Sequence, residues 1–174
     1  IQPDLSAWGK VLGNGQPISA LVGNNRARKA ASEIFVTGSY WFSAVPMAAA
    51  LETMRIVRET DYLEHLETIG TLFREKLVAQ AADFDFELRH TGPVTMPMVL
   101  FGEDPDFRLG YGFCRAAMKR GVYLSPYHNM FINGAMTEED ISQTLEATGA
   151  AFEEIKRNRN SLQPSQALVA LLDA

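Results

Sequence analysis

Apolar residues at intervals of three and four positions predict several helices along the chain. In the longest, Leu63, Leu66, Ile69, Phe73 and Leu77 fall on one face of a helix that we expect from Tyr62 to about Ala82. The segments in which such spacing and capping residues predict a helix are 44–58, 62–82, 107–120 and 137–157. A polar stretch at 24–31 is typical of a turn followed by a brief helix.

Short apolar runs between turn residues predict strands. The runs that we interpret in this way are 18–22, 84–89, 95–101, 122–124 and 130–132. Pro97 makes the third of them an edge strand or a broken one, because proline has no N–H to donate to a sheet. From Asn158 onward the sequence predicts a loop and a weak terminal helix. This order indicates part of an α/β layer at 1–60, a long connecting helix at 61–83, and a small α+β domain at 84–174.

Composition argues against several classes of partner. The 174 residues carry a net charge of −5, whereas binding to nucleic acid needs a basic face. No apolar run approaches the ~20 residues of a membrane helix, so we expect no membrane partner. Cys114 is the single cysteine and cannot form an intrachain disulfide, which suits a reducing, cytoplasmic compartment. No Cys/His/Asp cluster predicts a metal site, and His65 is expected on the exposed side of its helix.

The stretch 3–20 carries the clearest chemical signal. Lys10 follows Gly9 on a turn between apolar segments, and Gly13 and Gly15 let the chain bend sharply before the strand at 18–22. Glycine leaves space beside the lysine for a bulky group. An amine placed where it can lose solvent can condense with an aldehyde. A solvated surface charge is the alternative interpretation of Lys10.

The residues of this stretch resemble the lysine segment of class III aminotransferases. Their order is Asp-Leu, three residues, Gly-Lys, and then Leu-Gly-Asn-Gly-x-Pro-Ile-Ser-Ala. These are pyridoxal-phosphate enzymes of fold type I, a group that includes glutamate-1-semialdehyde aminomutase. The resemblance covers residues 3 to 157 and implies the end of a large-domain sheet followed by a small α+β C-terminal domain. It also implies that Lys10 holds pyridoxal 5'-phosphate as a Schiff base, the internal aldimine.

The loop ahead of the helix at 44–58 is a candidate for binding the cofactor phosphate. Small residues such as Gly38 and Ser39 present N–H groups and a hydroxyl to an anion. The resemblance implies that this loop reaches the cofactor of the neighbouring subunit in a homodimer with shared active sites, with Ser39 in place of the usual threonine. Tyr40 and Trp41 would then line the interface or the substrate pocket. The alternatives are an ordinary turn capped by Ser43 and a plain aromatic core.

His128, in a loop with Tyr127 and Asn129, is a weak candidate for the substrate entrance, and a hydrogen-bonded structural histidine is the alternative. The acid that pairs with the pyridinium nitrogen and the ring-stacking residue precede the lysine in this family. We therefore expect them upstream of Ile1, and we expect the chain to be incomplete as an enzyme.

The resulting hypothesis is a pyridoxal-phosphate-dependent aminotransferase. It would move an amino group between an amine or amino acid and a keto or aldehyde acceptor. An aminomutase or racemase of the same family, and a truncated domain that serves only in assembly, remain alternatives.

Overall fold

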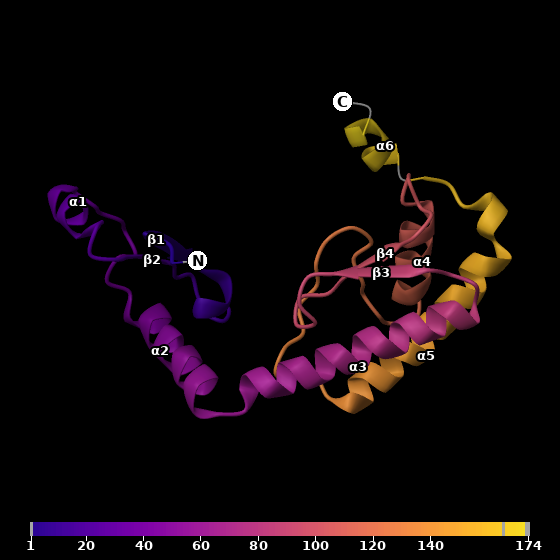
Figure 1. Cartoon of the computed structure of the whole chain (residues 1–174), viewed down its shortest axis with the longest axis horizontal. Helices are drawn as coiled ribbons and strands as arrows, with labels where there is room; N and C mark the ends of the chain where they lie inside the picture. Colours follow the sequence, from indigo (N-terminus) through magenta and orange to yellow (C-terminus); the bar gives the residue numbers. More distant parts are fainter. Residues whose placement is uncertain (1, 165, 173–174) are drawn as a thin grey trace. The chain divides into compact units, whose positions relative to one another are not determined.

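The computed structural model describes residues 2–164 and 166–172 (Figure 1). The chain divides into two compact units, residues 1–62 and 63–174. Each unit contains a two-stranded antiparallel sheet together with helices. The helix expected to connect two domains is grouped with the C-terminal unit.

The N-terminal unit begins with a hairpin around the lysine segment. Strand β1 (Leu5–Trp8) pairs with β2 (Ala20–Gly23), and a 3-10 helix, η1 (Lys10–Leu12), lies between them along the chain. The sequence predicted the second strand but not the first. Helices α1 (Arg28–Glu33) and α2 (Ala44–Glu59) follow.

This unit has little core of its own. Among its described residues only Gly13, Pro46 and Ala50 are buried. Ser43 takes the N-cap position of α2 as expected, but its side chain accepts no capping hydrogen bond, so that part of the prediction is wrong. Pro46 lies in the first turn of α2, where its missing N–H costs little.

The C-terminal unit holds most of the buried apolar residues. Its elements are α3 (Tyr62–Asp83, whose first residue belongs to the other unit), β3 (Leu88–Thr91), β4 (Met98–Phe101), α4 (Arg108–Met118), α5 (Glu138–Arg157), η2 (Arg159–Ser161) and α6 (Gln166–Leu172). Along α3, Leu66, Ile69, Phe73 and Leu77 are buried as predicted. Leu63 is an exception, with 56% of its surface exposed.

Phenylalanine rings form the centre of this unit. Phe152 of α5 lies 4.4 Å, centroid to centroid, from Phe113 of α4. It also contacts the rings of Phe84, Phe86 and Phe101 at about 6 Å. Helix α5 begins at the predicted capping box: Thr137 Oγ1 accepts the Asp140 N–H, and the Asp140 carboxylate accepts the Thr137 N–H at 2.8 Å.

Three of the predicted strands are wrong in part or in whole. The strand expected at 84–89 begins only at Leu88, because the N–H of Phe86 bonds back to Ala81 O at 2.9 Å, next to the left-handed Asp85 (φ 64°). The runs 122–124 and 130–132 form no strand. Instead, the N–H groups of Met130 and Ile132 donate to the carbonyls of Pro97 and Thr95 at 2.8 and 3.0 Å, which attaches this loop to the segment before β4.

Candidate active site

Lys10 lies at the start of η1, directly after β1. Its backbone is left-handed, with φ 51°, which is uncommon for a residue that carries a Cβ. Gly9 before it is fully extended, and the N–H groups of Leu12 and Gly13 donate to the carbonyls of Gly9 and Lys10 at 3.1 and 3.2 Å. The backbone around the lysine is therefore fixed by local hydrogen bonds.

Glycines are required in this turn for two different reasons. A Cβ on Gly13 would lie 2.2 Å from the carbonyl oxygen of Gln16, which is far closer than two atoms can approach. Gly15 has φ 101°, a conformation that L side chains rarely adopt. Gly9 differs, because the nearest atom to a Cβ there would be the Cβ of Ser19 at 3.9 Å. The space beside Lys10 is therefore open, as the sequence predicted.

The amine of Lys10 is available for chemistry. In the part of the chain that the structure describes, Nζ forms no hydrogen bond and no ion pair. The side chain is exposed. The expectation that this turn shields the amine from solvent is therefore wrong for the described residues, because the hairpin leaves the Lys10 side chain exposed.

Asp4 has a structural role in the same hairpin. Its carboxylate accepts hydrogen bonds from Asn24 Nδ2 at 2.7 Å and from the Arg26 guanidinium at 3.0 Å. The two partners follow β2, so Asp4 fastens the ends of the paired strands.

The candidate phosphate loop lies on the surface ahead of α2. Two successive turns, closed by Trp41 N–H to Gly38 O at 3.1 Å and Ser43 N–H to Tyr40 O at 3.0 Å, carry the chain into the helix. Ser39 is exposed and its hydroxyl has no partner among the residues described. Tyr40 and Trp41 are 83% and 52% exposed, so the plain-core alternative does not hold in this unit.

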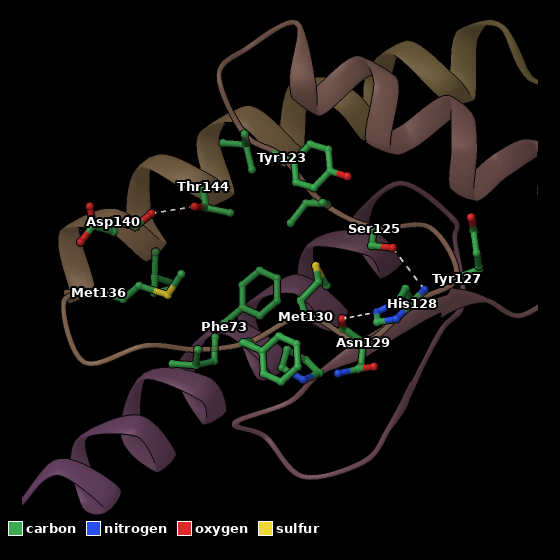
Figure 2. Close-up of a pocket in the computed structure, with 16 residues that line it drawn as sticks. Phe73, Tyr123, Ser125, Tyr127, His128, Asn129, Met130, Met136, Asp140 and Thr144 are labelled. Carbon is green, nitrogen blue, oxygen red and sulfur yellow. Dashed lines mark hydrogen bonds between the residues drawn. The ribbon is translucent and has the colours of Figure 1, made fainter. Parts of the chain in front are cut away.

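His128 belongs to the C-terminal unit and lines a cavity of about 620 Å³ (Figure 2). The ring nitrogen Nδ1 of His128 lies 2.8 Å from the carbonyl oxygen of Asn129, and the backbone N–H of His128 donates to Ser125 Oγ at 3.2 Å. Apart from the loop histidine itself, no pattern in the sequence predicted this cavity. The other residues that line it come from segments far apart in the chain.

The remaining titratable candidates do not form a site. No group of His, Cys, Asp and Glu suited to a metal occurs in the described residues. His65 is half-buried rather than exposed, and its Nε2 lies 2.9 Å from Met136 O. Burial raises the pKa of the Cys114 thiol to about 12, which leaves it protonated and unreactive. No helix among the described residues is long and apolar enough to cross a membrane.

The N-terminal unit thus presents an exposed lysine amine on a glycine-bounded hairpin, and comparison with known proteins shows the class to which this chain belongs. The sequence model of the aminotransferase class-III family matches residues 1–152, so the chain belongs to that family. The expected fold, the C-terminal part of a fold type I transferase, is confirmed.

Similar proteins carry related names. An aminopentol aminotransferase of Sphingopyxis macrogoltabida is 56% identical over the whole chain, which covers 41% of that protein. A glutamate-1-semialdehyde 2,1-aminomutase of Desulfitobacterium hafniense is 30% identical over 84% of the chain and 37% of its own length. The chain thus spans about two fifths of the length of these relatives.

Solved structures show the same fold. The internal aldimine form, with pyridoxal phosphate, of the FumI protein of Sphingopyxis sp. MTA144 matches with a TM-score of 0.94 and 56% identity, over 97% of this chain and 41% of that one. An omega-transaminase from Sphaerobacter thermophilus matches with a TM-score of 0.79 at 20% identity, over 90% and 40% of the two chains.

Proposed function

We propose that this chain is the lysine-bearing part of a pyridoxal-phosphate-dependent aminotransferase. The observation that carries the proposal is the unpartnered amine of Lys10 on a turn whose glycines leave open space beside it. Membership of the class III family and the cofactor named for the 56% identical FumI protein support it. Aminomutase activity has less support, since the relatives of that name are only 30% and 23% identical.

Lys10 would hold the cofactor covalently through Nζ, and Gly38 and Ser39 would bind a phosphate. These residues fit such a group, because the space beside Gly9 is open and the Ser39 hydroxyl is free to donate. Pyridoxal phosphate, when bound, withdraws electrons from the substrate carbon that carries the amino group. Once displaced by the substrate, the amine of Lys10 would take the proton from that carbon. A keto or aldehyde compound would accept the amino group.

For the substrate we propose an amine that carries hydroxyl groups. The support is the name of the relative with 56% identity, which refers to an aminopentol. The acid that pairs with the pyridinium nitrogen would come from residues outside this chain.

A homodimer with shared active sites is part of the proposal. Large apolar side chains next to Gly38 and Ser39 lie open to solvent in this unit: Phe35 is 92% exposed and Phe42 is 88% exposed. Apolar patches of this kind are typical of protein interfaces. The lone, half-buried Cys114 suits the cytoplasm, where we expect the enzyme to act.

The test is reduction of the complete protein with borohydride in the presence of pyridoxal phosphate, followed by peptide mapping. We expect a phosphopyridoxyl group on Lys10 and none in Lys10→Ala, which should also lose transamination. The control is Lys29→Ala, because Lys29 is also exposed in the same unit, with only a 4.0 Å contact to Glu33. A modified peptide that contains another lysine and not Lys10 would refute the assignment.

A further inference from the structure

The two strands of the N-terminal unit have no buried face that could fix their register. Every residue of β1 and β2 is exposed or half-buried. Register is strongly specified where one face of a sheet is buried, and weakly specified where both faces meet solvent. The connection between the strands, residues 9–19, is much longer than the about two to five residues of a tight hairpin, so its turn type does not set the pairing either.

The contacts that set the register lie at the open end of the hairpin. The pairing of Leu5 with Gly23 continues one step outward, to Asp4 and Asn24. The backbone N–H of Asn24 donates to the carbonyl oxygen of Asp4 at 3.0 Å, and Asn24 Nδ2 donates to the Asp4 carboxylate at 2.7 Å. The Arg26 guanidinium donates to both carboxylate oxygens, at 3.2 and 3.0 Å. We call Asp4, Asn24 and Arg26 together the Asp4 clasp.

The clasp is more than an exposed ion pair. Asp4 and Arg26 are 51% and 81% exposed, and such a pair contributes little by itself. Asn24, however, is held in place, because its side-chain oxygen accepts the backbone N–H of Arg26 at 2.9 Å. That bond leaves the side-chain amide hydrogens of Asn24 for Asp4, and a hydrogen bond to a charged acceptor is stronger than a neutral one. The clasp therefore joins the two strands through backbone and side chains at once.

The register of the hairpin decides where the Lys10 amine lies. Lys10 follows the last residue of β1 by two positions, so any sliding of β1 along β2 carries the lysine with it. A slip by two residues, which keeps each side chain on its own face, moves a strand by about 6–7 Å. A misplacement of about 1 Å can already cost about a hundredfold in rate. Contacts at the far end of the hairpin thus control the position of the reacting amine.

We propose that the Asp4 clasp positions Lys10 for its reaction with the cofactor. Asp4 acts as a positioning residue: its carboxylate holds the register, and the register places Nζ against the aldehyde carbon. In that reaction the amine forms a C=N bond to the carbon, and its two hydrogens leave with the aldehyde oxygen as water. The proposal rests on the proposed function, and all its residues belong to the N-terminal unit.

The test uses the complete protein without cofactor and two ligands. Pyridoxal phosphate can condense with Lys10, whereas pyridoxine phosphate, with an alcohol in place of the aldehyde, binds only noncovalently. In Asp4→Ala we expect the condensation rate, followed by visible absorbance, to fall at least about fivefold, and the Kd for pyridoxine phosphate to stay within about twofold of the wild type. A merely structural role would weaken both. The matched control is Glu33→Ala, which removes an exposed carboxylate of the same unit, 4.0 Å from Lys29, and should change neither.

An exchange variant, Asp4→Asn/Asn24→Asp, tests the pair itself. It moves the carboxylate to the other strand and keeps an amide opposite it, so the condensation rate should return to within about twofold of the wild type. The proposal is overturned by a wild-type rate in Asp4→Ala, or by an equal loss of affinity for pyridoxine phosphate. An exchange variant at least about fivefold slower than the wild type would also overturn it, and this variant decides alone if Asp4→Ala does not fold.

Failure of the proposed function has a different signature. Borohydride reduction would then leave no phosphopyridoxyl group on Lys10 of the wild type, and the positioning role of Asp4 would be refuted with it. A wild type that carries the group on Lys10, together with an Asp4→Ala variant that condenses equally fast, would refute the positioning role alone.

Discussion

One buried hydrogen bond fastens the two longest helices of the C-terminal unit to each other. Thr148 of α5 is fully buried, and its Oγ1 donates to Gln80 Oε1 of α3 at 2.6 Å. Gln80 Nε2 in turn donates to the carbonyl of Leu145, one turn before Thr148, at 2.8 Å. Phe73 of α3 and Thr144 of α5 line the cavity, so this bond also fixes the distance between two of its walls.

Thr148→Val should lower the free energy of unfolding of this unit by about 0.2–2.2 kcal/mol. Valine has nearly the same shape, but it leaves the half-buried Gln80 oxygen without a donor, which costs about 1–3 kcal/mol. The added buried methyl offsets this by about 0.8 kcal/mol. Gln80→Leu alone should cost less, because the Thr148 hydroxyl can then donate to Leu145 O, which lies 3.2 Å away.

The assay is urea unfolding of residues 61–174, followed by far-UV circular dichroism. Tryptophan fluorescence would not report on this unit, because Trp8 and Trp41 both lie in the other one. The double variant Thr148→Val/Gln80→Leu should be about 1 kcal/mol more stable than the sum of the single effects predicts. Additive effects, within about 0.3 kcal/mol, would show that the bond is not a coupled pair and would refute the reasoning.

Two further predictions concern the cofactor and pH. Ser39→Ala should weaken binding of pyridoxal phosphate by the complete enzyme by about 0.5–3 kcal/mol, as measured by spectroscopic titration, and Ser39→Thr should restore it; equal affinity in all three proteins would contradict the phosphate role. Burial and the neighbouring Arg74 lower the pKa of His90 from 6.5 to about 4. Between these values only the unfolded chain gains the proton, so the free energy of unfolding should fall by about 1–2 kcal/mol as the pH drops from 6.5 to 4, after allowance for screening at a half-buried ring. Urea titrations at several pH values should show this slope in the wild type but not in His90→Leu.

The long helices could be predicted because their apolar spacing repeats over many turns. The face of α3 from Leu66 to Leu77 is an example, and the capping box at Thr137 marks in the sequence where α5 begins. The strands could not be placed as well, since each has only four residues and depends on what it pairs with. Phe84 and Phe86 alternate like strand residues, but their backbone continues from the end of α3 and directs both rings to Phe152.

For the candidate site, the sequence predicted local geometry and not the surroundings. Gly13 and Gly15 are needed because the turn closes within a few residues, so the short sequence motif was enough to predict the turn. The exposure of the Lys10 amine depends on which distant segments cover it, and no local pattern encodes this. The cavity could not be predicted for the same reason. Its lining comes from four segments that meet only in the folded unit: α3, the segment before β4, the 122–132 loop and α5.

The lysine and the cavity thus depend on different kinds of information. The conformation of the backbone around Lys10 is determined within residues 4–26. The ion pair between Asp4 and Arg26, the antiparallel pairing of β1 and β2, and the glycine turn hold it in place. Such a segment can keep its shape with almost no core beneath it, as the exposed side chains of this unit show. The cavity has the opposite character, since two of its walls come from α3 and α5, which are distant in the sequence and are joined by the bond between Gln80 and Thr148. Substitutions in the hairpin should therefore alter the chemistry proposed for Lys10, whereas substitutions at Gln80 or Thr148 should alter the stability of the C-terminal unit.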